Sequence, residues 1–139
     1  MIRAVFDCSA VISGVGWRNE SYQCLVLVAR RRVRGFVTDW ICEEYRRVAQ
    51  GMEAEKLFAR SPWPVLDWFI SACRAVEPDA LGKQRSRDPS DDPYLACALA
   101  AKAEFVISPD QDLLVLGKPF GIEVLTPRAF LNQLYAARK

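Results

Sequence analysis

Short apolar runs recur along the chain, and segments of helical length separate them from one another. The runs occupy residues 2–7, 33–38, 103–108 and 121–125, with a brief further one around Val76. Strands that alternate with helices in this way predict a mainly parallel sheet, and we expect a three-layer α/β/α sandwich. A chain of 139 residues has room for one such domain, which we place at residues 1–139.

Helices are predicted between these runs. They span residues 19–32, 40–50, 53–61, 64–75 and 93–103, followed by a short helix or turn at 110–117 and a terminal helix that begins near Pro127. Asn19 or Ser21 is suited to cap the first helix and Asp39 the second, which Gly51 is suited to end. The arginines at 30–32 fall in the last turn of the first helix, where cations offset the helix dipole.

Carboxylates stand at the ends of two predicted strands. Asp7 closes the run at 2–7, and Asp110 follows the run at 103–108. In open parallel sheets, sites form outside the carboxyl ends of the strands, near the point where the strand order reverses. We therefore expect Asp7 and Asp110 to meet there, although they are far apart in the sequence.

Further aspartates crowd the stretch DPSDDPYLACALAAKAEFVISPDQDLL, residues 88–114, at positions 88, 91, 92, 110 and 112. Carboxylates that meet without compensation repel one another, and a hard divalent cation relieves this repulsion. Mg²⁺ and Mn²⁺ prefer oxygen ligands, and a site of this kind activates water and stabilises charge on a phosphodiester under attack. The sequence contains no histidine, which excludes Ser-His-Asp triads and His-ligated zinc. Metal-assisted hydrolysis is the main hydrolytic chemistry left.

Two adjacent aspartates precede the helix predicted at 93–103. Asp91 shares the spacing of one helix face with Leu95 and Ala98, so it is the better candidate to point toward a metal. Asp92 stands just before Pro93 and is better suited to cap the helix, although it stays a second candidate ligand.

The chain resembles the PIN-domain nucleases in four segments: VFDCSAVISG, EEYRRVAQ, DPSDDPYLACALAAKAEFVISPDQDLL and GIEVLTPRAFL. The resemblance extends over the whole chain and is greatest to the bacterial branch regarded as toxins of toxin–antitoxin pairs. It implies a PIN-like α/β/α fold with a Mg²⁺ or Mn²⁺ site that cleaves single-stranded or structured RNA. It also implies a homodimer and a cognate antitoxin protein as a partner.

The resemblance also assigns the site residues. Family members carry an Asp followed by a polar residue at a strand end, a helical Glu, an Asp before an alanine-rich helix, and a Ser or Thr two residues before a further Asp. The matching catalytic and metal-binding residues are Asp7, Glu44, Asp91 and Asp110, with Asp92 and Asp112 as further candidate ligands and Ser9 and Ser108 as orienting groups. Many relatives have Asn at the position of Ser9, so metal affinity or substrate placement is expected to differ here. Glu43 is an alternative to Glu44, whose spacing fits the family better.

Basic and aromatic residues suggest contacts with RNA. The candidates for phosphate contacts are Arg30, Arg31, Arg32, Arg34, Arg85 and Arg87, together with Lys83. The arginine run is equally well explained as the basic end of a helix. Trp17, which follows Gly16 just after the Asp7 strand, is the one tryptophan expected to touch substrate, with ordinary packing as the equal alternative.

Other functional classes stay open. A catalytically silent PIN fold that binds RNA or a protein is the main alternative, but such a protein has no use for uncompensated carboxylates in its cleft. A phosphoacceptor domain would need a suitably placed Lys or Thr, and none is evident. The aromatic segment at 58–70 fits either a dimer or antitoxin interface or ordinary helix packing. Five unpaired cysteines and the lack of a membrane segment predict a cytoplasmic protein.

Overall fold

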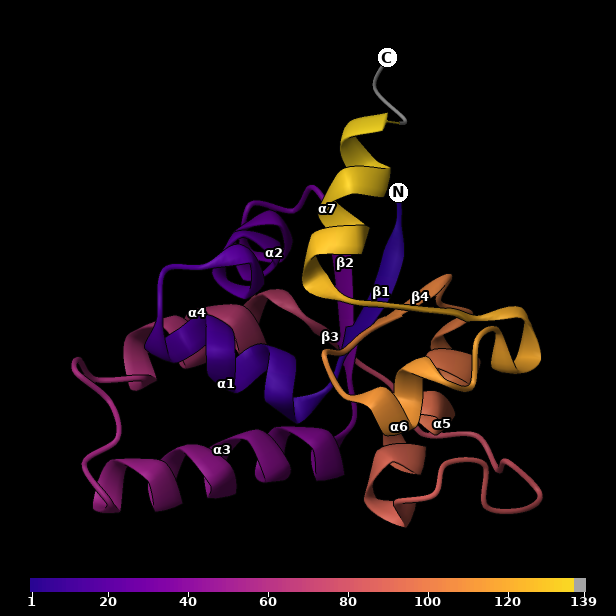
Figure 1. Cartoon of the computed structure of the whole chain (residues 1–139), viewed down its shortest axis with the longest axis horizontal. Helices are drawn as coiled ribbons and strands as arrows, with labels where there is room; N and C mark the ends of the chain where they lie inside the picture. The colour runs from indigo at the N-terminus through magenta and orange to yellow at the C-terminus, as the bar shows by residue number, and fades with distance from the viewer. Residues whose placement is uncertain (137–139) are drawn as a thin grey trace.

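The computed structural model describes residues 1–136, which contain a five-stranded sheet (Figure 1). Neighbouring strands all pair in parallel, in the order β3-β2-β1-β4-β5. The strands are β1 (Arg3–Phe6), β2 (Arg34–Val37), β3 (Arg74–Ala75), β4 (Phe105–Ile107) and β5 (Glu123–Leu125). The expected α/β/α class is confirmed, and the sheet is parallel throughout the described residues.

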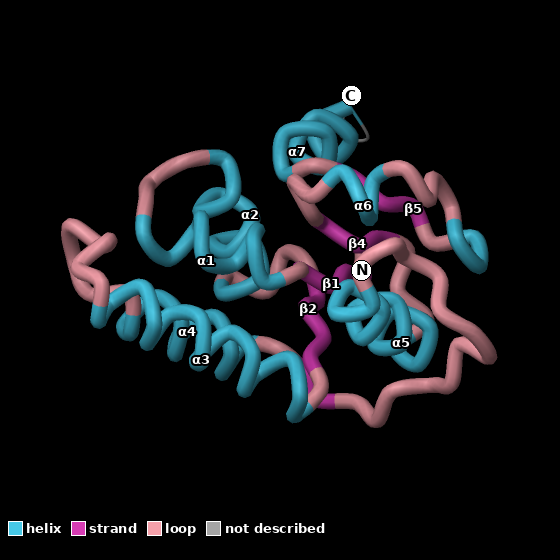
Figure 2. Tube along the Cα trace, turned by 60° about the horizontal axis from the view of Figure 1, so that its bottom comes forward, coloured by secondary structure: helices cyan, strands magenta, loops and turns pink. Residues whose placement is uncertain are grey.

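Helices cover both faces of the sheet (Figure 2). They are α1 (Cys8–Gly16), α2 (Glu20–Ala29), α3 (Asp39–Ala54), α4 (Trp63–Ala72), α5 (Asp92–Ala101), α6 (Gln111–Leu114) and α7 (Pro127–Ala136), with single 3-10 turns at Pro89–Asp91 (η1) and Pro119–Gly121 (η2). The helix α5 packs on one face, and α2, α4 and α7 lie on the other. Within residues 1–136, no helix combines the length and the apolar character needed to cross a membrane.

The central strand β1 ties the layers together through Phe6. Its ring makes edge-to-face contacts with Phe69 of α4, at a centroid distance of 5.5 Å, and with Phe130 of α7, at 6.4 Å. The hydroxyl of Tyr45, a fully buried residue of α3, donates to the Phe6 carbonyl. Since aromatic burial contributes more than most core contacts, these rings fix three helices against the strand that leads into Asp7.

The strand order reverses between β1 and β4, the two strands at the centre of the sheet. Phe6 is in register with Ile107, and the Asp7 N–H donates to the Ile107 carbonyl at 3.0 Å. The residues that follow both strands therefore emerge side by side. Ligand sites of open α/β sheets form at such a reversal.

A helix that the sequence patterns did not predict, α1, follows β1 directly. Asp7 is its N-cap, because the Asp7 Oδ1 atom accepts the N–H of Ala10 at 2.8 Å. Gly14 permits α2 to approach closely, since a Cβ atom there would lie 2.6 Å from Cδ1 of Leu25. The small residues after Asp7 thus serve helix packing.

The helix predicted at 53–61 is wrong, and so is the expectation that Gly51 ends the preceding helix. α3 continues through Gly51 to Ala54, and the residues at 55–61 contain no helix. A glycine inside a helix costs about 1 kcal/mol relative to alanine, and packing of the apolar face offsets this cost. The helix stops where Lys56 adopts a left-handed φ of 58° and the Leu57 N–H donates to the Met52 carbonyl at 3.0 Å.

The arginines at 30–32 do not lie in the last turn of α2, as predicted, but just beyond its end at Ala29. Arg31 adopts a left-handed φ of 59°, and the N–H groups of Arg32 and Val33 both donate to the Leu27 carbonyl. This turn closes the helix and leads into β2. The N-cap of α2 is Asn19, one of the two residues predicted for that role.

The N-cap of α3 is Thr38, and the prediction of Asp39 was wrong. The Thr38 hydroxyl accepts the N–H of Ile41 at 3.1 Å, whereas Asp39 is the first residue of the helix and is exposed. Sequence alone did not separate the two, because both side chains are good caps and the choice depends on where β2 ends.

Thr38→Ala is expected to lower the free energy of unfolding by about 1 kcal/mol, since the buried Ile41 N–H loses its acceptor. Asp39→Ala, one residue further on, is expected to change it by less than about half of this. Urea denaturation of both variants checks the assignment. An effect of Asp39→Ala as large as that of Thr38→Ala would contradict it.

Candidate metal centre and catalytic cleft

A cleft of about 450 Å³ opens at the carboxyl ends of β1 and β4. Carboxylates from four parts of the chain line it: the end of β1, the middle of α3, the turn before α5 and the loop after β4. They are Asp7, Glu44, Asp88, Asp91 and Asp110. No lysine or arginine of the described residues lines this cleft. It therefore collects negative charge from several elements, and Arg47 offsets that of Glu44 from outside the cleft lining.

Asp7 follows β1 and Ser108 follows the adjacent strand β4, and their side chains connect the ends of these two strands. The buried Ser108 hydroxyl donates to Asp7 Oδ2 and accepts the N–H of Asp110 at 2.9 Å. Burial raises the pKa of Asp7 to about 7, the hydrogen bonds from Ser108 and Ala10 oppose this rise, and the neighbouring charges of Asp91 and Asp110 add to it. The Asp7 carboxylate is therefore costly to ionise unless a cation compensates it.

Asp91 lies in the turn η1 immediately before α5 and is buried. Its Oδ2 atom accepts the hydroxyl of Ser86 at 3.2 Å. Burial is the main cause that raises its pKa to about 6, and the charge of Asp110 contributes next. The expectation that Asp91 points inward thus agrees with its place in the cleft.

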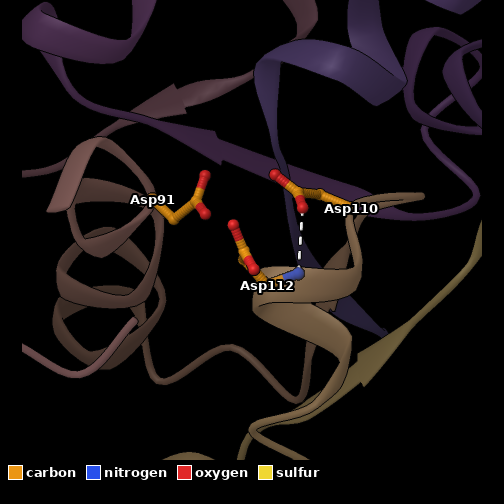
Figure 3. A group of neighbouring side chains, drawn as sticks. All are labelled: Asp91, Asp110 and Asp112. Carbon is orange, nitrogen blue, oxygen red and sulfur yellow. Dashed lines mark hydrogen bonds between the residues drawn. The ribbon is translucent and has the colours of Figure 1, made fainter. Parts of the chain in front are cut away.

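Three aspartates bring their carboxylates together: Asp91 and Asp110, which line the cleft, and the neighbouring Asp112 (Figure 3). One oxygen atom of each lies within 4.8 Å of those of the other two. Asp110 is the N-cap of α6, and its Oδ1 accepts the Asp112 N–H at 2.9 Å, so one short turn holds both residues. Asp112 also forms an ion pair with Arg87 at 2.8 Å. Asp112, only a further candidate from sequence, thus belongs to the cluster.

Glu44 lines the cleft from α3, apart from these three aspartates. Its carboxylate forms an ion pair with Arg47, one turn further along the helix. Glu43, the alternative from sequence, is exposed and does not line the cleft. Of the two glutamates, the structure brings Glu44 to the site.

The prediction that Asp92 caps α5 is wrong. Its carboxylate instead reaches back to the preceding loop, where it accepts the N–H groups of Arg85 at 2.9 Å and Ser86 at 2.8 Å. Both oxygens are thereby used to hold the loop that carries Ser86. Asp88 has a local role as well, because its Oδ1 accepts the N–H and the hydroxyl of Ser90.

Two residues at the site were not predicted from the sequence. Ser86 is buried, and its hydroxyl contacts both the Asp91 carboxylate and the Asp112 carbonyl. Tyr94 lines the cleft, is only 2% exposed, and among the described residues its hydroxyl has no hydrogen-bond partner. Tyr94 stands three residues after Asp91, the spacing of one helix face, and this spacing could have indicated it. Ser9 is exposed at the cleft, in contrast to the buried Ser108.

The basic residues lie around the site in different ways. Arg34 is in register with Arg3 where the parallel strands β2 and β1 begin. The arginine run at 30–34 is therefore at the opposite end of the sheet from the cleft. Arg85 places its guanidinium over the Phe120 ring, 4.7 Å from the centroid, and donates to the Leu81 carbonyl. Arg87, also among the predicted arginines, forms an ion pair with Asp112 of the acidic cluster.

The donors present fit a hard divalent cation. All of the clustered ligands are carboxylate oxygens, the ligand type that Mg²⁺ and Mn²⁺ prefer. Burial raises the pKa of Asp7 to about 7 and that of Asp91 to about 6, so a cation bound beside them would favour their ionised forms. Fold and site together define a three-layer α/β/α domain with an acidic cleft at the point where the strand order reverses.

The chain belongs to the PIN domain family, since the model of that family matches residues 3–112. This range includes every aspartate of the cleft, and PIN domains are in general nucleases that use a divalent metal. Among solved structures, the chain is similar to the crystal structure of PAE2754 from Pyrobaculum aerophilum, with a TM-score of 0.66 and 16% identity over 97% of this chain and 90% of that one. At this identity the likeness concerns the fold. No curated protein sequence matches the chain.

Proposed function

We propose that this chain, as a single domain over residues 1–139, is a metal-dependent endoribonuclease that hydrolyses RNA phosphodiester bonds. One observation carries the proposal: Asp91 and Asp110, which line the cleft, gather carboxylate oxygens with the neighbouring Asp112 within 4.8 Å, and Arg87 is ion-paired with Asp112 alone of the three. Membership of the PIN domain family supports the nuclease class.

Asp91, Asp110 and Asp112 would hold Mg²⁺ or Mn²⁺, with Asp7 beside them. When bound, such a cation polarises a phosphoryl oxygen and makes water a better nucleophile near neutral pH. Asp7 remains able to contribute, because a carboxylate has about four lone-pair sites and the hydrogen bonds from Ala10 and Ser108 use two of them.

The other polar residues position these groups. Ser108 orients Asp7 through its hydroxyl and Asp110 through the Asp110 N–H. Glu44, on the α3 wall of the cleft, would orient the attacking water or accept its proton, and Arg47 restrains the carboxylate of Glu44. Ser9, exposed at the cleft, would contact the phosphate.

We further propose that the protein is the toxin of a toxin–antitoxin pair, acts in the cytoplasm as a homodimer and binds a cognate antitoxin protein. The sequence resemblance to the bacterial toxin branch supports this role. Exposed apolar side chains, including Leu57 and Trp68, offer surfaces for such partners. Expression in a bacterial host should arrest growth, and coexpression of a small DNA-binding protein encoded immediately upstream should restore it. Growth that is unaffected by expression of an active nuclease would contradict the toxin role.

The nuclease proposal is tested with purified protein and end-labelled single-stranded RNA in Mg²⁺, Mn²⁺ or EDTA. We expect internal cleavage with either cation and none in EDTA. DNA of the same sequence, in parallel, tests the choice of RNA. Absence of both cleavage and calorimetric Mn²⁺ binding, with RNA binding retained, would favour the silent binding protein instead.

Ser108→Ala is expected to lower the affinity for Mn²⁺ by roughly 10-fold, because groups that orient metal ligands typically contribute this much. The variant removes the hydroxyl that links Asp7 to Asp110 and leaves every carboxylate in place. Isothermal titration calorimetry measures the change, with Ser71→Ala on the exposed surface of α4 as the matched control. Equal Mn²⁺ affinities of Ser108→Ala and the parent would contradict the orienting role.

A further inference from the structure

Apolar side chains line the cleft together with its carboxylates: Ile12, Trp17, Val48 and Met52. Trp17 is the large aromatic residue among them and is 46% exposed. A divalent cation held by the carboxylates would attract phosphate, and the exposed indole offers a face to an aromatic group. With its cation, the cleft is therefore suited to a ligand that has both phosphate and aromatic groups.

The Trp17 ring is supported from behind. Phe58, from the segment between α3 and α4, lies against it with ring centroids 5.9 Å apart. Phe58 reaches this position because residue 16 is glycine, where a Cβ atom would lie 2.8 Å from two atoms of the Phe58 ring. The ring pair is therefore a built feature of the cleft wall.

The backbone that carries Trp17 is also restrained. The Trp17 N–H donates to the Ser13 carbonyl at 3.2 Å, and the Asn19 side chain donates to the Ser13 hydroxyl at 2.9 Å. Asn19 is in turn the N-cap of α2. Hydrogen bonds on both sides of Trp17 thus restrain the backbone that carries the indole before any ligand arrives, which lowers the entropic cost of binding.

A cation accompanies the indole. Arg18 follows Trp17, and its guanidinium lies over the Tyr22 ring, 4.2 Å from the centroid. Arg18 is exposed and does not line the cleft, so its charge would be available to a phosphate of a bound nucleic acid outside the cleft.

We propose that Trp17 stacks on a nucleobase next to the scissile phosphate and so positions the RNA for cleavage; this inference rests on the proposed nuclease function. A base can stack on Trp17 only when it is unpaired, so the residue favours a single-stranded segment at the cut. Stacking on an aromatic residue contributes about 1–3 kcal/mol per base and tolerates every base, because each has a π face. A protein side chain is the competing occupant, but it would leave the adjacent acidic site without a role.

The kinetic test compares Trp17→Ala and Trp17→Phe with the parent on a single-stranded RNA that has one cleavage site. We expect Trp17→Ala to raise KM by roughly 10-fold and Trp17→Phe by much less, because phenylalanine keeps an aromatic face. A second RNA has an abasic nucleotide beside the cut, and on it the parent and Trp17→Ala should have equal KM. Tyr135→Ala, which removes an exposed aromatic side chain on α7, is the matched control.

A binding test separates this inference from the nuclease proposal. In the Asp91→Asn protein, the single-stranded oligonucleotide should quench tryptophan fluorescence, and a second change, Trp17→Ala, should abolish that quenching. If the parent protein does not cleave RNA in Mg²⁺ or Mn²⁺, the nuclease proposal is rejected. The quenching of tryptophan fluorescence still tests whether a base stacks on Trp17. Parent-like KM on both RNAs, with quenching retained after Trp17→Ala, would overturn the role of Trp17 and leave the nuclease proposal standing.

Discussion

Asp91→Asn is expected to lower the rate of metal-dependent RNA cleavage by on the order of 100-fold, because a carboxylate ligand contributes several kcal/mol through the cation it holds. Asparagine has nearly the same shape and keeps an oxygen that can accept the Ser86 hydroxyl bond. The variant therefore removes charge without opening a cavity. Initial cleavage rates and calorimetric Mn²⁺ titrations measure the two consequences separately.

The control for this variant is Asp67→Asn, which makes the same change of charge on the exposed surface of α4. It should retain parent-like cleavage and Mn²⁺ affinity. Asp110→Asn should resemble Asp91→Asn, since both residues belong to the cluster and to the cleft. Full metal-dependent activity in Asp91→Asn, with unchanged Mn²⁺ affinity, would reject the acidic cluster as the catalytic metal site.

The stability of the metal-free protein is expected to fall as the pH rises from about 4 to about 7. The pKa of Asp7 is about 7 in the folded chain and 3.8 as its ordinary value, so between these values the folded state binds a proton that the unfolded state lacks. The contribution of protonated Asp7 to the free energy of unfolding is complete below its ordinary pKa. It is lost as the pH rises toward the pKa of Asp7 in the folded chain. A single such group changes the free energy of unfolding by up to about 1.4 kcal/mol per pH unit. Asp91, with a pKa of about 6, acts in the same direction.

Urea denaturation at pH 5, 6, 7 and 8 measures this slope, with Asp7→Asn for comparison. Asp7→Asn should have a smaller slope and should exceed the parent in stability at pH 8 without metal, because no buried charge forms. Saturating Mg²⁺ or Mn²⁺ should stabilise the parent at pH 8 by binding the ionised carboxylates, and Asp7→Asn less so. Identical slopes for the parent and Asp7→Asn would contradict the buried, uncompensated state of Asp7.

The short apolar runs in the sequence predicted the strands of the sheet well, because a strand buried between two layers of helices consists mainly of apolar residues. The apolar runs before Asp7 and Ser108 became β1 and β4, and the weak run near Val76 became the two-residue β3. Helix ends were less predictable. Gly51 lies inside α3 rather than after it, since the packing of a continuous apolar face outweighs the local preference of one residue.

Candidate ligands were predictable as residue types but not as contacts. The sequence placed Asp91 and Asp110 near strand and helix ends, where α/β sites form, and the fold brings their carboxylates together. The sequence could not show that the Asp92 carboxylate accepts the N–H groups of Arg85 and Ser86. Asp91 and Asp92 both stand just before Pro93, and local preferences do not distinguish them. Nor could the sequence show that Asp112 joins the cluster, which depends on the direction of the turn after β4.

By itself, the sequence determined the α/β class, the acidic and histidine-free character of the chemistry, and membership of the PIN domain family. The tertiary structure decided which carboxylates meet, the shared hydroxyl of Ser108 between Asp7 and Asp110, and the place of Trp17 in the same cleft. The physical reason is the separation along the chain over which each kind of interaction acts. Periodicity and turn preferences act over a few neighbouring residues, whereas the site depends on the register of β1 with β4, strands that are distant in the chain.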